Sequence, residues 1–174
     1  FGDLPTYLSR PAVEDHPQNH SWDDVVNGIV EGLRDVLLSW TDNEPEGASA
    51  FVAESLEDKN EMVRRIAIYV LNQRWSVLKS LYKNIISARL FDSRNIHETY
   101  HLLKDRFAEF SDPEKSSTLE EIHHLSLPPD HEESARRLMR TQRNWLSAIA
   151  GKGYEPADSW FRELDADPSI GKLS

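Results

Sequence analysis

Hydrophobic residues recur at helical spacing through the central part of the chain, from residue 60 to residue 110. Three helices with minimal breaks between them are predicted there, with the sequences NEMVRRIAIYVL, RWSVLKSLYKNIIS and NIHETYHLLKDRFAEF. The positions predicted to face the core are Val63, Ile66, Ala67, Val70 and Leu71 in the first helix, Leu78, Leu81, Tyr82 and Ile85 in the second, and Ile96, Tyr100, Leu103 and Phe107 in the third. This tract contains no alternation at the period of a strand, so its apolar stripes have only one another to pack against.

Further helices are predicted on both sides of the central tract. The first runs from about residue 22 to residue 40, and the residues that it is expected to bury are Val25, Val26, Ile29, Leu33, Val36, Leu37 and Trp40. A short helix over residues 48–56 follows, and Asn60 is expected to cap the next one. After the tract, Ser111 and Glu114 form a capping box, a long helix ends at Gly151, and a short helix covers residues 156–164.

These elements predict an all-α fold of about eight helices in four consecutive pairs, over residues 22–57, 61–87, 94–125 and 131–164. The pair spacing favours an irregular stack of antiparallel helical pairs, a HEAT-like superhelix, with a compact orthogonal bundle as the alternative. Residues 1–20 contain three prolines and are predicted to be an extended arm or linker. Residues 21–165 are predicted as a single helical domain and residues 166–174 as a linker tail. Because the chain begins at Phe1, we expect a fragment of a larger protein.

The composition narrows the classes of function. Hydrophobic residues make up 39% of the 174 residues and charged residues 29%, as in ordinary folded domains. A formal net charge of −10 disfavours non-specific attraction to nucleic acid or to an anionic membrane. The chain has no cysteine, which excludes disulfides, thiolate metal sites and cysteine nucleophiles and fits a reducing cytosol. With no apolar run of the roughly 20 residues that a bilayer span needs, a cytoplasmic protein is expected.

One sequence has the form of a catalytic motif. His97-Glu98-Thr99-Tyr100-His101 reads H-E-x-x-H on a predicted helix. In metalloproteases, histidines one turn apart share a zinc ion, and the glutamate beside the first histidine acts as the base toward the zinc-bound water. Glu120 or Glu121 is a candidate third ligand on a downstream helix. A zinc-dependent hydrolase with zinc as its cofactor is therefore the alternative function.

Helix periodicity disfavours that alternative. If Ile96, Tyr100 and Leu103 face the core, His97 and His101 lie roughly 100–140° away, on a solvated flank. A catalytic zinc ion needs a supported cleft that partly excludes water. The histidines are accordingly predicted to be surface residues, and the chain is predicted not to be an enzyme.

A row of arginines is a second candidate site. Arg136, Arg140 and Arg143 are predicted to form a stripe opposite the apolar face of the long helix near the C-terminus. Such a row could bind phosphate groups or an acidic partner. The simpler interpretation is a solvated face that pairs with nearby carboxylates.

Two stretches resemble a known group of proteins. VRRIAIYVLNQRWSVLKSLYKNIISARLFDSRNIHETYHLLKDRFAEFSDPEKSSTLEEI resembles helical segments in the C-terminal halves of large bacterial multidomain proteins, and RNWLSAIAGKGYEPADSWFRELDADPSIGKLS is similar to segments that follow in them. Those proteins carry sirtuin-like or STAND-type nucleotide-dependent effector modules and are associated with defence against phage. The resemblance implies a helical sensor or scaffold region, a domain of unknown function without catalytic residues of its own. An effector module would lie outside this chain.

The expected function is therefore that of a non-enzymatic helical scaffold or sensor module within a larger bacterial protein. Its expected partners are other domains of the same polypeptide or another protein, and neither nucleic acid nor a membrane is expected.

Overall fold

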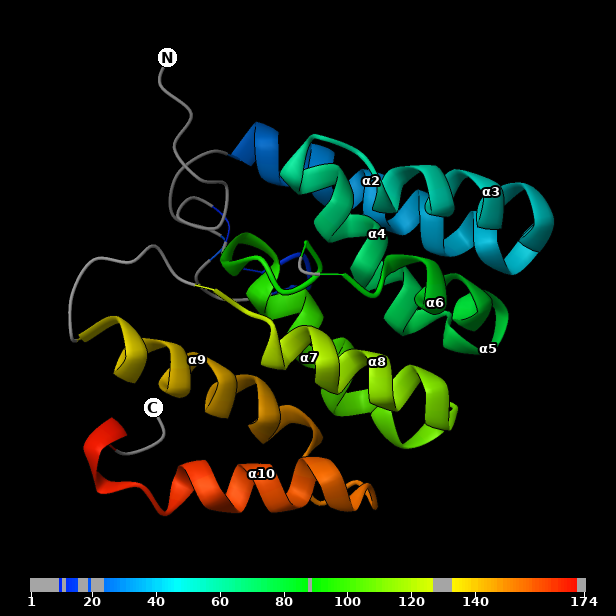
Figure 1. Cartoon of the computed structure of the whole chain (residues 1–174). Coiled ribbons are helices and arrows are strands. Elements are labelled where there is room, and N and C mark those ends of the chain that lie inside the picture. The colour runs from blue at the N-terminus through cyan, green and yellow to red at the C-terminus, as the bar shows by residue number, and fades with distance from the viewer. Residues whose placement is uncertain are drawn as a thin grey trace. The chain divides into compact units, whose positions relative to one another are not determined.

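The structure, a computed structural model, describes residues 10, 12–15, 19, 24–87, 89–126 and 133–171. These residues form helices and no strand, which confirms the predicted all-α fold of about eight helices (Figure 1). The HEAT-like stacking of the helical pairs stays a prediction. The contacts divide the chain into two compact units, the first with residues up to Ile85 and Asp92–Leu102, the second with Ile86–Phe91 and the residues from Leu103 onward. Residues 21–165, predicted as one domain, contribute to both.

Unit 1 contains the helices up to and including the HETYH motif. They are α2 (Asp24–Asn43), α3 (Pro45–Leu56), α4 (Glu61–Gln73), α5 (Trp75–Leu78), the 3-10 turn η2 (Lys79–Leu81), α6 (Tyr82–Ile85), the 3-10 turn η3 (Ser93–Asn95) and the first part of α7 (Ile96–Arg106). Helices α2, α3 and α4 all pack on one another (Figure 1). The second helix of the central tract, predicted as continuous, is divided by η2 into two single turns.

The core of unit 1 is centred on α4. Its predicted core residues Ile66, Ala67, Val70 and Leu71 are at most 1% exposed, which confirms the periodicity. Asn60 caps this helix as predicted, because its side chain accepts hydrogen bonds from the amides of the first turn. Leu78, Tyr82 and Ile85 are also buried, as predicted for the following helix.

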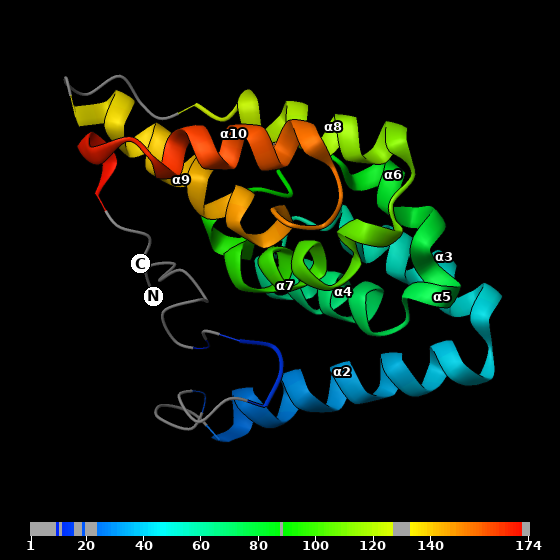
Figure 2. The ribbon, with the colours of Figure 1, turned by 90° about the horizontal axis from the view of Figure 1, so that it is seen from below.

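The prediction for α2 is wrong about which face is buried. The predicted core residues Val25, Val26, Ile29 and Val36 are 71%, 49%, 65% and 61% exposed. The buried positions are Leu37, as predicted, together with Asn27, Val30, Arg34 and Thr41. Three of these five side chains are polar, and two of them bind a segment that precedes α2 in the sequence. The most apolar stripe of α2 therefore faces solvent. Helix α2 itself packs on α3 and α4 (Figure 2).

Unit 2 contains the remaining helices. They are the last part of α7, the 3-10 turn η4 (Phe107–Glu109), α8 (Asp112–His123), α9 (Glu133–Ile149), α10 (Glu155–Asp165) and the 3-10 turn η5 (Pro168–Ile170). Helices α9 and α10 run antiparallel, side by side (Figures 1 and 2). Gly151 ends α9 with a φ of 77°, and the capping box of Ser111 and Glu114 starts α8, both as predicted.

The C-terminal tail is packed within unit 2 as far as the structure describes it. Ile170 is fully buried, although residues 166–174 are predicted to be a linker. The core of unit 2 also contains the edge-to-face pair of Phe91 and Trp145, with ring centroids 5.3 Å apart. None of the described helices combines the length and hydropathy that a membrane span requires.

Candidate functional site

The N-terminal arm, here residues 10, 12–15 and 19, packs within unit 1. Arg10, Ala12 and Val13 are at most 1% exposed. The Val13 amide donates to Oε1 of Glu98 over 3.0 Å, and the Val13 carbonyl accepts from the guanidinium groups of Arg10 and Arg34. Arg65 donates to the Arg10 carbonyl over 2.8 Å. This part of residues 1–20, predicted as a linker, is thus held by specific hydrogen bonds on both sides.

Polar side chains of α2 form one side of the surface on which the arm packs. Asn27 accepts from Arg10 over 2.8 Å and donates to the Asn19 carbonyl over 2.6 Å. Arg34 bridges to Asp15 over 2.8 Å and to Asp35 over 2.7 Å. The hydrogen bond to Asp35, with further contributions from Asp15, raises the pKa of the Arg34 guanidinium above its ordinary value. Buried polar groups need such partners, which explains why α2 turns this face inward.

Glu98 of the HETYH motif is a buried counter-ion. Its carboxylate is engaged by Arg65 in a two-pronged pair, Nε to Oε2 and Nη2 to Oε1, both over 2.9 Å. With the Val13 amide, three donors occupy its two oxygens, and the residue is 2% exposed. A general base must reach the water whose proton it takes. Glu98, on α7, instead links this helix to α4 through Arg65 and to the arm through the Val13 amide.

The buried face of the third helix of the tract differs from the predicted one at Ile96, whereas Leu103 and Phe107 are buried as predicted. Ile96, predicted to face the core, is 49% exposed, whereas Glu98, Thr99, Leu102 and Leu103 are at most 2% exposed. The prediction for Ile96 is wrong because it assumed that the charged residue Glu98 would face solvent. The helix instead turns Glu98 inward, and Ile96 is exposed. Arg65, fully buried on α4, supplies the opposite charge that lets Glu98 be buried.

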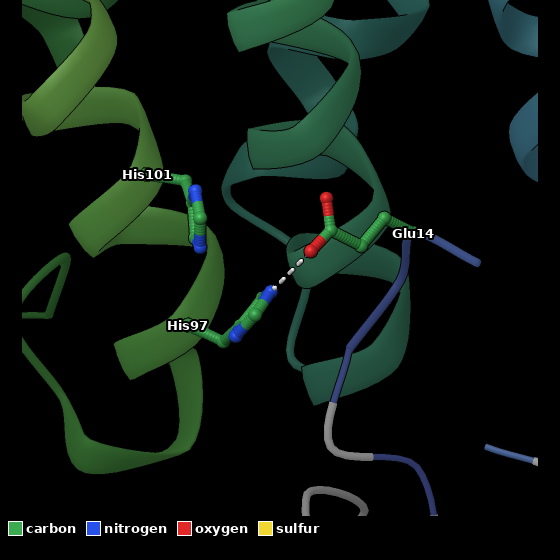
Figure 3. A group of neighbouring side chains, drawn as sticks. All are labelled: Glu14, His97 and His101. Atoms are coloured by element: carbon green, nitrogen blue, oxygen red, sulfur yellow. Dashed lines mark hydrogen bonds and ion pairs between the residues drawn. The ribbon is translucent and has the colours of Figure 1, made fainter. Parts of the chain in front are cut away.

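His97 and His101 lie one turn apart on α7 and face the arm (Figure 3). His97 Nε2 is 3.1 Å from Oε1 of Glu14, and the two imidazole centroids are 4.6 Å apart. Glu14, His97 and His101 each offer one ligand atom, and the three atoms lie within 4.8 Å of one another. All three side chains are partly buried, so the flank predicted to be solvated is partly covered by the arm.

Glu14 carries no sequence signal as a partner of the histidines. It precedes His97 by 83 residues, in a segment without helical periodicity. Glu121, the predicted candidate third ligand, lies on α8 in unit 2. Tyr69 of α4 is near the same group: burial raises the pKa of its phenol, with the negative charge of Glu14 among the lesser causes.

The predicted arginine stripe is largely used within unit 2. Arg143 is 1% exposed and donates to the Gly171 carbonyl over 2.5 Å, so its predicted place on a solvated face is wrong. Arg140 donates to the Ile170 carbonyl over 3.0 Å. Arg136 is exposed. Two of the three arginines thus bind the backbone around η5, and they are not aligned as a free phosphate-binding row.

Comparisons of the chain with protein-family models, with curated proteins and with solved structures returned no match.

Proposed function

We propose that the chain is a non-enzymatic helical scaffold or sensor module that binds a basic amphipathic helix of a partner protein. The observation that supports this most directly is the outward apolar face of α2. We name it the α2 stripe: the exposed residues Val25, Val26, Ile29 and Val36 with the half-buried Leu33 and Trp40. Contiguous exposed apolar surface of this kind is typical of protein interaction sites.

The shape of the α2 stripe fits a helix. From Val25 to Trp40 it extends about 22 Å along α2, given a rise of about 1.5 Å per residue. Gly28 and Gly32 lie on the exposed side of the same helix, and a Cβ added at either would meet nothing within 4 Å. Small residues four apart let a second helix approach closely. At the far end, Phe51 of α3 contacts Trp40, with centroids 5.6 Å apart, and extends the apolar surface.

The charge around the α2 stripe favours a basic partner. Residues 24–56 contain seven acidic residues and a single basic one, Arg34, which is buried. Asp35 and Asp42 keep 62% and 53% of their side-chain area exposed although each pairs with an arginine. Complementary charge promotes association, and like charge opposes it. A second copy of this chain would bring the same acidic side chains, so a basic helix is the better occupant.

The competing class, a zinc-dependent hydrolase, depends on Glu98 as the base. The buried pair with Arg65 and the bond from the Val13 amide leave this carboxylate no access to a metal-bound water. This supports the proposal of a non-enzymatic module over the alternative of a hydrolase. The resemblance of the helical stretches supports, as part of the same proposal, a setting inside a larger cytoplasmic bacterial protein of a defence system.

The experiment uses two synthetic helical peptides of about 18 residues, long enough to follow the α2 stripe. Both have the same Leu-rich face, one with Lys and one with Glu flanks, and binding is measured by fluorescence anisotropy. We expect the Lys-flanked peptide to bind more tightly than the Glu-flanked one. The substitution Ile29→Arg should weaken binding of the Lys-flanked peptide at least about tenfold, because an unpaired charge would be buried in the interface. Val77→Arg on α5, where Val77 is 41% exposed, is the matched control and should leave binding unchanged.

Two outcomes would overturn the proposal. Equal binding by the two peptides, or equal binding by Ile29→Arg and the original chain, would remove the α2 stripe as the site of a basic helix. Sedimentation of the chain alone tests the other occupant: a dimer that Ile29→Arg dissolves would assign the stripe to a second copy.

A further inference from the structure

We propose that Glu14, His97 and His101 form a binding site for a divalent transition-metal ion, best suited to zinc, that fastens the N-terminal arm to α7. The site is independent of the α2 stripe and needs no catalytic activity. It rests on three ligand atoms within 4.8 Å of one another, contributed by two segments far apart in the sequence.

The geometry is close to that of a bound ion (Figure 3). Zinc–nitrogen and zinc–oxygen bonds of about 2.0–2.2 Å place neighbouring ligand atoms of a tetrahedral ion roughly 3.3 Å apart. Glu14 Oε1 and His97 Nε2 are already 3.1 Å apart. The pair of histidines at positions i and i+4 of α7 lies on one side of the helix, with the rings 4.6 Å apart. A small rotation of these partly exposed side chains would bring a ring nitrogen of His101, the remaining ligand atom, to bonding distance.

The donor set selects the class of metal. Two imidazoles and one carboxylate suit zinc and neighbouring first-row ions, whereas calcium and magnesium prefer sites built entirely of oxygen. The three protein ligands leave a fourth position of a tetrahedral ion for water. Glu98, next to His97 in sequence, is held by Arg65, so the ion would have a structural role.

The arm places Glu14 before any ion binds. The neighbouring residue, Val13, is fixed at its amide by Glu98 and at its carbonyl by Arg34. Glu98 in turn adjoins His97, so the residues next to Glu14 and next to His97 are joined by one hydrogen bond. A site that is already ordered avoids the entropy cost of collecting its ligands. This separates Glu14, His97 and His101 from a pair of surface histidines that binds metal by chance.

The first test is zinc binding to the full chain at neutral pH, measured by calorimetry. We expect one ion per chain, and His101→Gln and Glu14→Gln should each weaken binding at least about tenfold, since losing even an outer-shell partner costs that much. Substitution with Co²⁺ should give the visible absorption of a four-coordinate site. His124→Gln, which removes an exposed histidine of unit 2, is the matched control and should bind zinc normally.

The second test distinguishes a clamp on the arm from chance chelation. Hydrogen exchange at the Val13 amide should slow when zinc is added to the original chain, and should not change in Glu14→Gln. Circular dichroism establishes that each variant is folded. Zinc binding that survives Glu14→Gln, with no change in Val13 exchange, would identify adventitious chelation by the two histidines and overturn the proposal. The absence of zinc binding by the folded original chain would also overturn it.

Discussion

At the scale of single residues, the buried pair of Arg65 and Glu98 has the largest expected effect on stability. Both side chains are at most 1% exposed, and their guanidinium and carboxylate groups meet in a two-pronged arrangement. The net contribution of such a pair is small, because its attraction is offset by desolvation of both charges. Removing one member is costly, however, because the other charge stays buried without compensation.

Glu98→Gln should therefore destabilise the chain by about 3–5 kcal/mol, measured as the free energy of unfolding in urea. The amide keeps the size of the side chain and can still accept from Val13, so the loss reports the missing charge. Glu109→Gln is the control: it breaks an exposed pair with Arg106 and should cost less than about 1 kcal/mol. If the two variants were equally stable, Glu98 would not be the structural counter-ion described above.

A second residue-scale prediction concerns acid. The side-chain hydrogen bond from Arg94 is the main cause that lowers the pKa of Asp92 below its ordinary value of 3.8. A lowered pKa in the folded state contributes stability at pH values above 3.8, and this contribution is lost as the pH falls through the lowered value. The difference in urea midpoint between the original chain and Asp92→Asn should thus shrink between about pH 6 and about pH 3. A difference independent of pH would contradict this.

At the scale of helices, periodicity predicted where helices form better than which face each one buries. In helix α4 the predicted core positions Ile66, Ala67, Val70 and Leu71 are buried, although Arg64, Arg65 and Asn72 are buried beside them. Helix α2 did not follow the prediction, because Asn27 and Arg34 turn inward to bind the arm, and this interaction has no local sequence signal. The same holds for the metal-ligand group: the spacing of His97 and His101 is visible in the sequence, whereas Glu14 joins them only through tertiary packing.

Substitution of the glycines of α2 should have opposite effects on the stability of the chain and on its proposed binding of a helix. Gly28→Ala and Gly32→Ala should each stabilise the chain by about 0.5–1 kcal/mol, because glycine in a helix costs that much and the added methyl meets no atom. The same substitutions should weaken binding of the Lys-flanked peptide, because the added methyl groups keep the peptide helix farther from α2. Urea unfolding and anisotropy measure the two effects. Gly151→Ala is the control and should destabilise, since φ is 77° there. A gain in both stability and binding would contradict close helix contact.

At the scale of the whole molecule, the net charge of −10 acts on every encounter. Because acidic side chains surround the α2 stripe, part of the affinity for the Lys-flanked peptide is electrostatic and should be screened by salt. Its dissociation constant should rise as the salt concentration increases from about 0.05 M to about 0.5 M, while that of the Glu-flanked peptide should fall or stay constant. Anisotropy titrations at several salt concentrations measure this. Identical salt dependence for both peptides would show that charge has no part in recognition.

The same charge balance leads to a prediction about nucleic acid. Phosphate binding needs several basic side chains on one accessible face. Arg143 is buried and Arg140 donates to the Ile170 carbonyl, so two of the three arginines predicted as a row are engaged within unit 2. A fluorescein-labelled DNA duplex should therefore bind more weakly than about 10⁻⁴ M at physiological salt, the weak limit of ordinary non-specific binding. Tighter binding that declines steeply with salt and is reduced in Arg136→Ala would contradict this prediction. It would show that the chain presents a local basic surface despite its net charge of −10.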